Sequence, residues 1–353
     1  MSFPKKPSYS KSDIDQAGKA ACCSKPGSKA YDDSIKIINE WRVCHEYPMQ
    51  TFNVSLRRKA RVINKDAVVV RRLKRLATIL DKIGYRQNAM LLSRMQDVGG
   101  VRAIMKTVAE VDKLRNIYLE PGRFPHILKR EYDYIRHPKN SGYRGVHLVY
   151  EFNNSQGRQP DSRNWDGLLI EMQLRTELQH AWATSVEVVG TMRHENLKSS
   201  MGDKTWLELF QCMSSIIAQI ENQPALPQHN GWNTRKLYRH TCSLVQKLNA
   251  IDVMRGWVTG MRWINERSRS YYTILTIDLD KKLVMVLGFS RRELDQANAR
   301  LKKLEEVSKN NQPVLVAAGD IKSIKRAYPN YALDSSNFLK IMESVVKTVE
   351  DNV

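Results

Sequence analysis

Residues 168–176 read LLIEMQLRT, a run in which apolar and polar side chains alternate. This period of two predicts a strand whose successive side chains point to opposite faces. One face would be apolar and buried, whereas the other carries a carboxylate, an amide and a guanidinium, which are Glu171, Gln173 and Arg175. Such a row could bind a metal ion and phosphate, or it could be the wet face of an ordinary strand.

Two further apolar runs precede this strand: VRAIM at residues 101–105 and VHLVYEF at residues 146–152. Gly, Pro and Asn separate the runs, and segments with helical periodicity lie between them, which predicts an α+β (mixed α/β) fold. Helical patterns follow from about residue 177 to 219 and again from about 234 to 250, with a break between them at residues 221–233 that contains two prolines and a glycine.

The last 85 residues have the pattern of a separate small α+β module. Two apolar strands around DKK at residues 280–282 predict a hairpin, followed by a charged helix, a third strand and a closing helix. The first 28 residues are rich in Lys, Ser, Pro and Gly and predict a mobile basic tail. We therefore expect three parts: residues 1–28, a main domain with a helical extension at 29–268, and a C-terminal module at 269–353.

Apolar residues between Asp66 and Ile83 recur at three- and four-residue spacing, which predicts one amphipathic helix. Its exposed part would carry the basic side chains Arg72, Lys74, Arg75 and Lys82. These cations could hold a triphosphate, or they could merely keep the helix in water.

The charge of the chain is strongly positive, with 57 Lys and Arg against 37 Asp and Glu, a net charge of +20. This balance predicts a polyanionic partner or substrate, such as nucleic acid, nucleotides or an anionic membrane surface. Five cysteines without CxxC spacing favour neither a disulfide framework nor a zinc site. No apolar run approaches the ~18 residues of a membrane span, so we expect a cytoplasmic protein.

Two short stretches add candidate ligand-binding residues. MQDVGGVRAIM at residues 95–105 places Asp97 before a strand, where it could join Glu171 in binding Mg²⁺, although Asp before Gly-Gly is also common in plain turns. NSGYRGVH at residues 140–147 places Tyr143 in a turn, where its ring could pack locally or stack on a nucleobase.

Taken together, these stretches resemble the ordered motifs of the RelA/SpoT nucleotide pyrophosphokinase domain. The resemblance rests on RLK at 72–74, DVGGVR at 97–102, DYIRHPKNSGYRGVH at 133–147 and EMQLRT at 171–176, and it extends over roughly residues 50–220. It implies a mixed sheet flanked by helices. It also implies transfer of pyrophosphate from ATP to a ribose 3′-hydroxyl, with Mg²⁺ as the metal.

The resemblance also implies roles for individual residues. Arg72 and Arg102 would flank the adenine, and Lys74 and Lys82 would hold the ATP phosphates. Asp97 and Glu171 would bind Mg²⁺, and Glu171 would help to deprotonate the attacking hydroxyl. The acceptor would be bound by Tyr143, Lys139, His147, Gln173 and Arg175.

The identity of the acceptor is left open by the motifs. No His-Asp-rich hydrolase region precedes them, so we expect a synthetase without hydrolase activity. The net charge favours the 3′ CCA end of tRNA, because a polyanion gains affinity from each neutralised phosphate. The alternatives are synthesis of (p)ppGpp or (p)ppApp from free nucleotides and, in another class, a non-catalytic RNA-binding protein.

The C-terminal stretch RAYPNYALD at residues 326–334 contains a Tyr-x-x-Tyr motif, Tyr328 and Tyr331. With the preceding hairpin module, it resembles the CapRel-type fused toxin–antitoxin proteins of prophages. That resemblance implies a pseudo-zinc-finger-like module whose tyrosines obstruct the ATP site until a phage structural protein, such as the major capsid protein, binds. No cysteine follows Cys242, so no zinc is expected in the module. The two tyrosines could instead simply anchor a loop.

Overall fold

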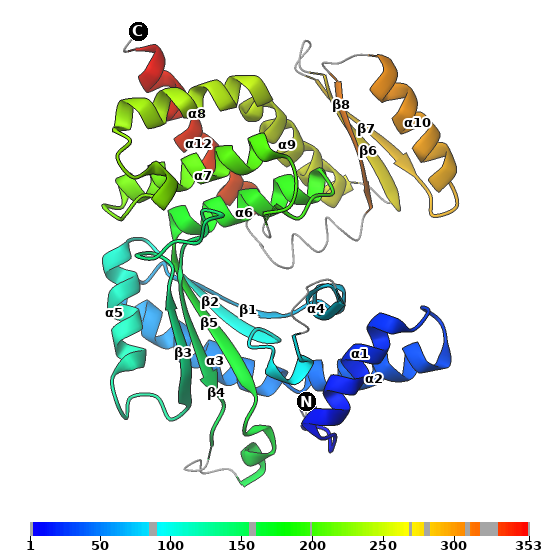
Figure 1. Cartoon of the computed structure of the whole chain (residues 1–353), viewed down its shortest axis with the longest axis vertical. Coiled ribbons are helices and arrows are strands. Elements are labelled where there is room, and N and C mark those ends of the chain that lie inside the picture. The colour runs from blue at the N-terminus through cyan, green and yellow to red at the C-terminus, as the bar shows by residue number, and fades with distance from the viewer. Residues whose placement is uncertain are drawn as a thin grey trace. The chain divides into compact units, whose positions relative to one another are not determined.

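The structure is a computed structural model that describes residues 3–84, 90–154, 160–197, 200–267, 270–278, 283–307, 311–317 and 331–351. The chain forms two compact units (Figure 1). One comprises residues 1–134 and 145–176, and the other comprises residues 135–144 and 177–353. The domain boundaries expected at residues 28 and 268 do not coincide with this division and stay predictions.

The first unit contains a five-stranded sheet with the strand order β1-β2-β5-β4-β3. Strands β2 and β5 are parallel and all other neighbours are antiparallel, so the sheet is mixed, as predicted. The strands are β1 (Val68–Leu73), β2 (Gly99–Met105), β3 (Ile127–Asp133), β4 (Val146–Glu151) and β5 (Leu169–Thr176). The expected α+β fold and the alternation of residues 168–176 are therefore confirmed.

Helices of the same unit support this sheet (Figure 1). Helix α3 packs against β1 and β2, and α5 packs against β2 and β5. The helices are α1 (Lys11–Cys23), α2 (Lys29–Val43), α3 (Glu46–Ile63), α4 (Leu76–Gly84) and α5 (Val108–Leu119), with short 3₁₀ turns at η1 (Leu92–Arg94) and η2 (Pro160–Trp165). On α3 the buried side chains include Met49, Phe52, Leu56 and Ala60, which recur at three- and four-residue spacing along one stripe.

The single helix predicted between Asp66 and Ile83 is wrong. Residues 68–73 form β1, which pairs in antiparallel register with β2, and α4 begins only at Leu76. Three consecutive valines at 68–70 favour a strand, because their branched side chains fit a pleated sheet better than a helix. Lys74 is consequently buried after the end of the strand rather than exposed on a helix.

The prediction that residues 1–28 form a mobile tail is wrong for residues 11–23, which form the helix α1. Ser10 caps this helix in a reciprocal capping box with Asp13. The side chains of Ile14, Ala17 and Ala21 are buried, at the spacing of one helical stripe. Small residues on that stripe let the helix pack closely, although they carry little of the hydrophobicity that the composition argument required.

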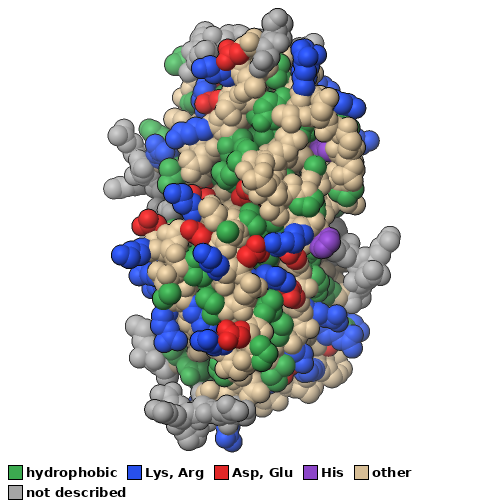
Figure 2. Space-filling view, turned by 90° about the vertical axis from the view of Figure 1, so that its left-hand side faces the viewer, with side chains coloured by type: hydrophobic (Ala, Val, Ile, Leu, Met, Phe, Trp, Pro, Cys, Tyr) green, Lys and Arg blue, Asp and Glu red, His purple; other side chains and the backbone are tan. Residues whose placement is uncertain are grey.

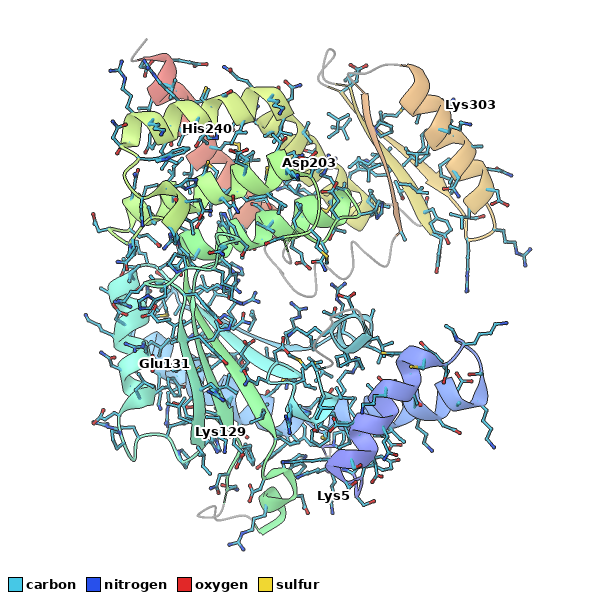
Figure 3. The ribbon with its side chains drawn as sticks, viewed as in Figure 1. Lys5, Lys129, Glu131, Asp203, His240 and Lys303 are labelled. Atoms are coloured by element: carbon cyan, nitrogen blue, oxygen red, sulfur yellow. The ribbon has the colours of Figure 1, made fainter. Side chains whose placement is uncertain are left out.

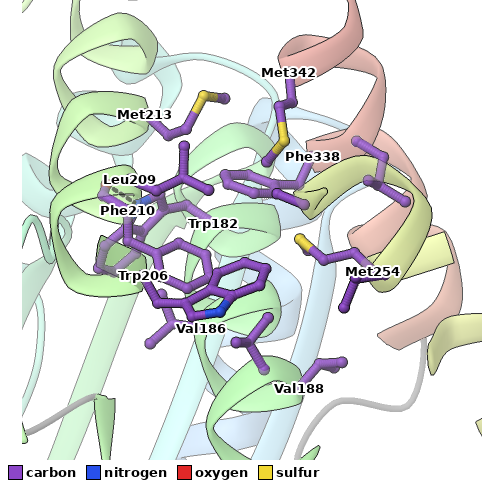
Figure 4. Close-up of a cluster of buried hydrophobic side chains, with 14 of the residues drawn as sticks. Trp182, Val186, Val188, Trp206, Leu209, Phe210, Met213, Met254, Phe338 and Met342 are labelled. Carbon is purple, nitrogen blue, oxygen red and sulfur yellow. Dashed lines mark hydrogen bonds between the residues drawn. The ribbon is translucent and has the colours of Figure 1, made fainter. Parts of the chain in front are cut away.

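The second unit is built around a bundle of helices with an aromatic core. Its helices are α6 (Glu177–Met192), α7 (Lys204–Ile220), α8 (Thr234–Leu248), α9 (Ala250–Arg267) and α12 (Tyr331–Glu350), with a 3₁₀ turn at η4 (Pro227–His229). Asp203 caps α7 (Figure 3). Figure 4 shows Trp182, Trp206, Phe210, Phe338 and Met342 packed together, and all five side chains are buried.

A three-stranded antiparallel sheet with the order β7-β6-β8 completes the second unit. Its elements are β6 (Tyr272–Asp278), β7 (Leu283–Phe289), α10 (Leu294–Val307) and β8 (Asn311–Ala317). The expected strands and charged helix are confirmed, and residues 280–282 lie outside the described residues. Helix α12 packs on α6, α8 and α9, so the final helix belongs to the bundle.

No helix in the described part of the chain combines the length and apolar character that crossing a bilayer requires.

Candidate functional site

A cluster of opposite charges lies where β1 ends and β2 begins. Residues Leu73 and Gly99 face each other across the two strands, and the Lys74 N–H donates to the Val98 carbonyl at 2.8 Å. This pairing brings Lys74 next to Asp97, with 2.6 Å from its Nζ to Oδ2. Thus the register of one strand pair fixes the position of the first ion pair.

The second cation of the cluster comes from α4. Lys82 Nζ lies 2.9 Å from Oδ2 and 3.1 Å from Oδ1 of Asp97. Burial opposes ionisation of Asp97, but Lys74 and then Lys82 outweigh it and lower the pKa of the carboxyl. Burial also lowers the pKa of Lys74, against the attraction of Asp97. The cluster therefore holds an ionised carboxylate that is shared by two ammonium groups.

Glu171 lies on the central strand β5, between hydrogen-bonding neighbours. His147 Nδ1, from β4, is 2.8 Å from Oε1 of Glu171, and Gln173 Nε2 donates to Oε2 at 2.6 Å. Burial would raise the pKa of Glu171, but the influence of His147 and the hydrogen bond from Gln173 bring that pKa down to about 2. Glu171 is therefore an oriented, ionised carboxylate.

The polar row of β5 continues onto the neighbouring strand β2. Gln173 Oε1 accepts from Arg102 Nε at 3.1 Å and from Arg175 at 3.2 Å. Arg102 and Gln173 face each other in the parallel register, as do Gly100 and Glu171. The structure thus brings together the residues predicted on the polar face of residues 168–176, while their roles stay predictions.

The fit of Mg²⁺ can be assessed from the donor groups. Asp97 and Glu171 influence each other's ionisation electrostatically. Magnesium commonly takes one or two carboxylates and completes its shell with water and substrate phosphates. Among the described residues, no group of three or more His, Cys, Asp or Glu side chains could hold a metal ion by itself. Two carboxylates beside two lysines fit a metal that arrives with a phosphate ligand.

Arg72 and the two C-terminal tyrosines complete the placement of the predicted site residues. Arg72 lies half-buried on β1, opposite Gly100 of β2. Tyr328 lies outside the described residues. Tyr331 is the first residue of α12, and only its backbone is described.

Tyr143 and Lys139 lie in the segment at residues 135–144, which belongs to the second unit. Tyr143 is half-buried and packs against the hydrophobic core of that unit. The Lys139 N–H donates to the Tyr143 carbonyl at 3.3 Å, and Lys139 Nζ lies 5.3 Å from the centre of the tyrosine ring. The ring therefore has local packing partners, and its half-exposed state leaves surface for a ligand.

Arg144 follows Tyr143 in the sequence and is a residue that the sequence reasoning missed. Its side chain is only 2% exposed, and burial lowers the pKa of its guanidinium to about 10. It donates to the Ile135 carbonyl at 2.9 Å, the Pro224 carbonyl at 2.7 Å and Ser214 Oγ at 3.1 Å. The motif shows an arginine between Tyr143 and a glycine, but nothing local identifies partners up to 80 residues away.

Gly142 shows how tightly this segment is held against α7. Ser214 Oγ donates to the Gly142 carbonyl at 2.6 Å. The backbone of Gly142 has a φ of +92°, and a Cβ there would lie 3.0 Å from the side chains of both Ser214 and Trp182. Only glycine combines this left-handed conformation with such close packing. The segment that carries Tyr143 is therefore clamped on both sides of the tyrosine.

A family comparison identifies the region that contains the candidate residues of the first unit. Residues 71–194 match the family model described as a region found in RelA / SpoT proteins. The curated GTP pyrophosphokinase YjbM of Bacillus subtilis (strain 168) is 32% identical over 120 residues, which are 33% of this chain and 52% of that protein. The chain thus spans about half the length of this relative. The expected resemblance to RelA/SpoT proteins is therefore supported over residues 71–194.

Two solved structures are similar to part of this chain at lower identity. Small alarmone synthetase 1 from Bacillus subtilis, bound to its product pppGpp, is 23% identical with a TM-score of 0.44, covering 53% of this chain and 94% of that one. Small alarmone synthetase 2 from the same organism is 18% identical with a TM-score of 0.42, covering 52% and 94%.

Proposed function

We propose that this chain is a Mg²⁺-dependent pyrophosphokinase that transfers pyrophosphate from ATP to a ribose 3′-hydroxyl. The observation that carries the proposal is the Asp97 carboxylate shared by Lys74 and Lys82. A second carboxylate, Glu171, acts on it electrostatically within a region that matches RelA/SpoT proteins. The relative named as a GTP pyrophosphokinase supports the same reaction class.

The two lysines give the site its affinity for a triphosphate. In the absence of nucleotide, they neutralise Asp97 and lower the cost of keeping that carboxylate buried. Phosphate oxygens can take over the ammonium groups, which frees Asp97. Magnesium bound by Asp97 and Glu171 would supply positive charge at the phosphate oxygens. Such transfer depends mainly on positioning and on compensation of developing negative charge.

Glu171 has two tasks in this proposal. Its low pKa keeps it ionised at neutral pH, so it is ready to bind a cation. A carboxylate with a pKa of about 2 is a weak general base, because catalytic bases work best with a pKa near the working pH. It would assist deprotonation of the attacking hydroxyl only after the substrate replaces the contact with His147 or Gln173.

For the acceptor, we propose the 3′ CCA end of tRNA, supported by the net charge of +20. Tyr143 would stack on a terminal base, which contributes about 1–3 kcal/mol per base. On the face that Figure 2 shows, Lys and Arg side chains are scattered among other residues, so this support comes from bulk charge. The name of the curated relative favours a free guanosine nucleotide as the competing acceptor.

Autoinhibition by Tyr328 and Tyr331, with release by a phage structural protein, extends the proposal and is supported by the Tyr-x-x-Tyr motif and the order of the parts. Tyr331→Ala in the full-length chain should then make expression toxic. A truncation near residue 268 is a poorer test, because it removes Phe338 and Met342 from the core of the second unit. Harmless expression of a Tyr331→Ala protein with normal synthesis would contradict autoinhibition.

The decisive experiment supplies Mg²⁺ and γ-labelled ATP together with tRNA, GDP, GTP or ATP as acceptor. Label on the 3′ end of tRNA supports the proposed acceptor, and label on a free nucleotide identifies an alarmone synthetase instead. RNA binding without any transfer of label would indicate a non-catalytic RNA-binding protein. Glu171→Gln is the matched inactive control in each reaction.

A further inference from the structure

Helix α1 precedes the region that matches RelA/SpoT proteins, yet it packs against the part of the site that would bind ATP. It contacts α2, and it also contacts α4 and η1 (Figure 1). Lys82 lies on α4, and η1 ends three residues before Asp97. One helix outside the matched region therefore contacts both segments that bring the Lys82–Asp97 ion pair together.

Gly18 is buried at a point where α1 packs closely against both α4 and η1. A Cβ on Gly18 would lie 3.3 Å from Ile83 Cδ1 and 3.4 Å from the Cβ of Leu92. Ile83 directly follows Lys82 in α4. A larger side chain at position 18 must therefore displace α4, η1 or both, since protein interiors have little free volume.

Asp15 adds a polar bond between α1 and the segment before Asp97. Its Oδ1 accepts from the Ser93 N–H at 2.8 Å, and its Oδ2 accepts from Ser93 Oγ at 2.8 Å. Ser93 is the middle residue of η1. This two-point contact orients the segment as well as attaching it, because both carboxylate oxygens have defined partners.

Contacts at both ends keep α1 in place. At its C-terminal end, Cys22 Sγ lies 3.2 Å from the position of a Cβ on Gly84, the last residue of α4. Before the helix, the Trp165 indole donates to the Pro4 carbonyl at 2.8 Å, near the Lys5 side chain labelled in Figure 3. The N-terminal segment is thus attached independently of the α1–α4 contact.

We propose that α1 is a positioning element for the ATP-binding side of the site, with Gly18 and Asp15 as its positioning residues. Gly18 sets how closely α4 and Lys82 approach, and Asp15 orients the segment that leads to Asp97. This inference rests on the proposed function, since the Lys82–Asp97 pair matters for catalysis only if this site binds ATP. Substitutions in α1 should lower kcat/KM for ATP and leave the KM for the acceptor unchanged.

The first test compares Gly18→Leu with Lys19→Leu in the full-length chain. Both place leucine in α1, but Lys19 is exposed whereas Gly18 is buried against α4. Gly18→Leu should lower kcat/KM for ATP by about tenfold or more, because small misplacements of a catalytic group are costly. The acceptor KM should stay within about twofold of its original value. Lys19→Leu should leave both constants unchanged.

The second test uses the milder Asp15→Ala, which remains informative if Gly18→Leu does not fold. Asp15→Asn is its rescue variant, because an amide can accept from the Ser93 N–H and donate to Ser93 Oγ. Asp33→Ala, at an exposed position of α2, is the charge-matched control. We expect reduced kcat/KM for ATP in Asp15→Ala, substantial recovery in Asp15→Asn and no effect in Asp33→Ala.

Two further measurements separate this inference from the proposed function. Amide hydrogen exchange over residues 76–84 reports whether α4 is loosened, and equilibrium binding of a non-hydrolysable ATP analogue reports donor affinity without turnover. If the unchanged protein transfers no pyrophosphate, the proposed function fails, and the analogue affinities of the variants still decide the role of α1. Faster exchange in α4 with unchanged ATP affinity and kcat/KM would overturn the inference and leave α1 a purely structural helix.

Discussion

Asp97 and Arg144 are both charged groups in poorly solvated surroundings, but they are compensated in different ways. Asp97 is paired with two full positive charges, from Lys74 and Lys82. Arg144 donates its hydrogen bonds to two carbonyls and one hydroxyl, all of them neutral, and Glu221 acts on it only electrostatically. Two of the three side chains in the first cluster are partly exposed, 22% for Asp97 and 27% for Lys82, whereas Lys74 and Arg144 are buried.

The comparison shows which of the two arrangements can exchange partners. Ammonium groups that bind a carboxylate can also bind phosphate oxygens, and the partial exposure of Lys82 and Asp97 gives a ligand access to the cluster. The oxygens around Arg144 would lose their partner in the buried interior if the guanidinium moved, at about 1–3 kcal/mol for each unsatisfied group. We therefore expect the Asp97 cluster to act in ligand binding, and Arg144 to act as a fixed support for the segment that carries Tyr143.

Asp97→Asn should have the largest effect on activity. The substitution removes a proposed metal ligand, so pyrophosphate transfer should fall by about 10³-fold or more. Steady-state assays with labelled ATP measure this loss, and thermal unfolding should show that the protein remains folded. Retention of most of the activity would mean that the magnesium assignment to Asp97 is wrong.

Arg144→Met should have the largest effect on stability. It leaves three buried oxygens without their donor, and breaking a buried charged network of this kind typically costs about 3–5 kcal/mol. Urea unfolding measures the change in the free energy of unfolding, and Arg144→Lys is the control that keeps the charge. If both variants unfold like the unchanged protein, Arg144 does not support the fold.

Glu171 should make the stability of the first unit fall at acidic pH. Its pKa falls from 4.5 in the unfolded chain to about 2 in the folded one, so it stabilises the fold fully above pH 4.5. That stability is lost as the pH falls from about 4.5 to 2. Since a pKa unit corresponds to about 1.4 kcal/mol, the total is on the order of 3 kcal/mol.

The measurement is the free energy of unfolding as a function of pH for the unchanged protein and for Glu171→Gln. The difference between them should shrink as the pH falls through this range, because the amide does not titrate. Arg144 remains protonated throughout, so its own titration adds nothing to the slope of the curve in this range. Parallel curves for Glu171→Gln and the unchanged protein would exclude a low pKa for this carboxyl.

Ser214→Ala should have the smallest effect of the series. The serine accepts from Arg144 and donates to the Gly142 carbonyl, so its loss should cost about 1–2 kcal/mol of stability. If the hydrogen bonds of Ser214 to Gly142 and Arg144 also position Tyr143, the KM for the acceptor should rise while the KM for ATP stays constant. Combining Ser214→Ala with Arg144→Met in a double-mutant cycle measures the coupling, and simple additivity would show that the two residues act independently.

Local patterns were sufficient to predict the central strand and the side-chain types on its polar face. The alternation at residues 168–176 placed Glu171, Gln173 and Arg175 on one face because side chains of any strand alternate. The prediction of one helix between Asp66 and Ile83 failed because the apolar spacing spans two elements, β1 and α4. Pairing with β2 and the three adjacent valines favour a strand in the first of them. The prediction of a mobile tail from the composition of residues 1–28 also failed, because small side chains can pack closely against the rest of the unit.

The sequence by itself determined the chemical types in the candidate site and the strand that carries Glu171, Gln173 and Arg175, because charge and side-chain period are properties of single residues and their neighbours. Only the tertiary structure decided their partners. Strand register placed Lys74 on Asp97 and His147 beside Glu171, and the packing of the second unit joined Arg144 to the Pro224 carbonyl, 80 residues away. Such contacts depend on positions to within about an ångström, because hydrogen bonds and ion pairs weaken steeply with distance.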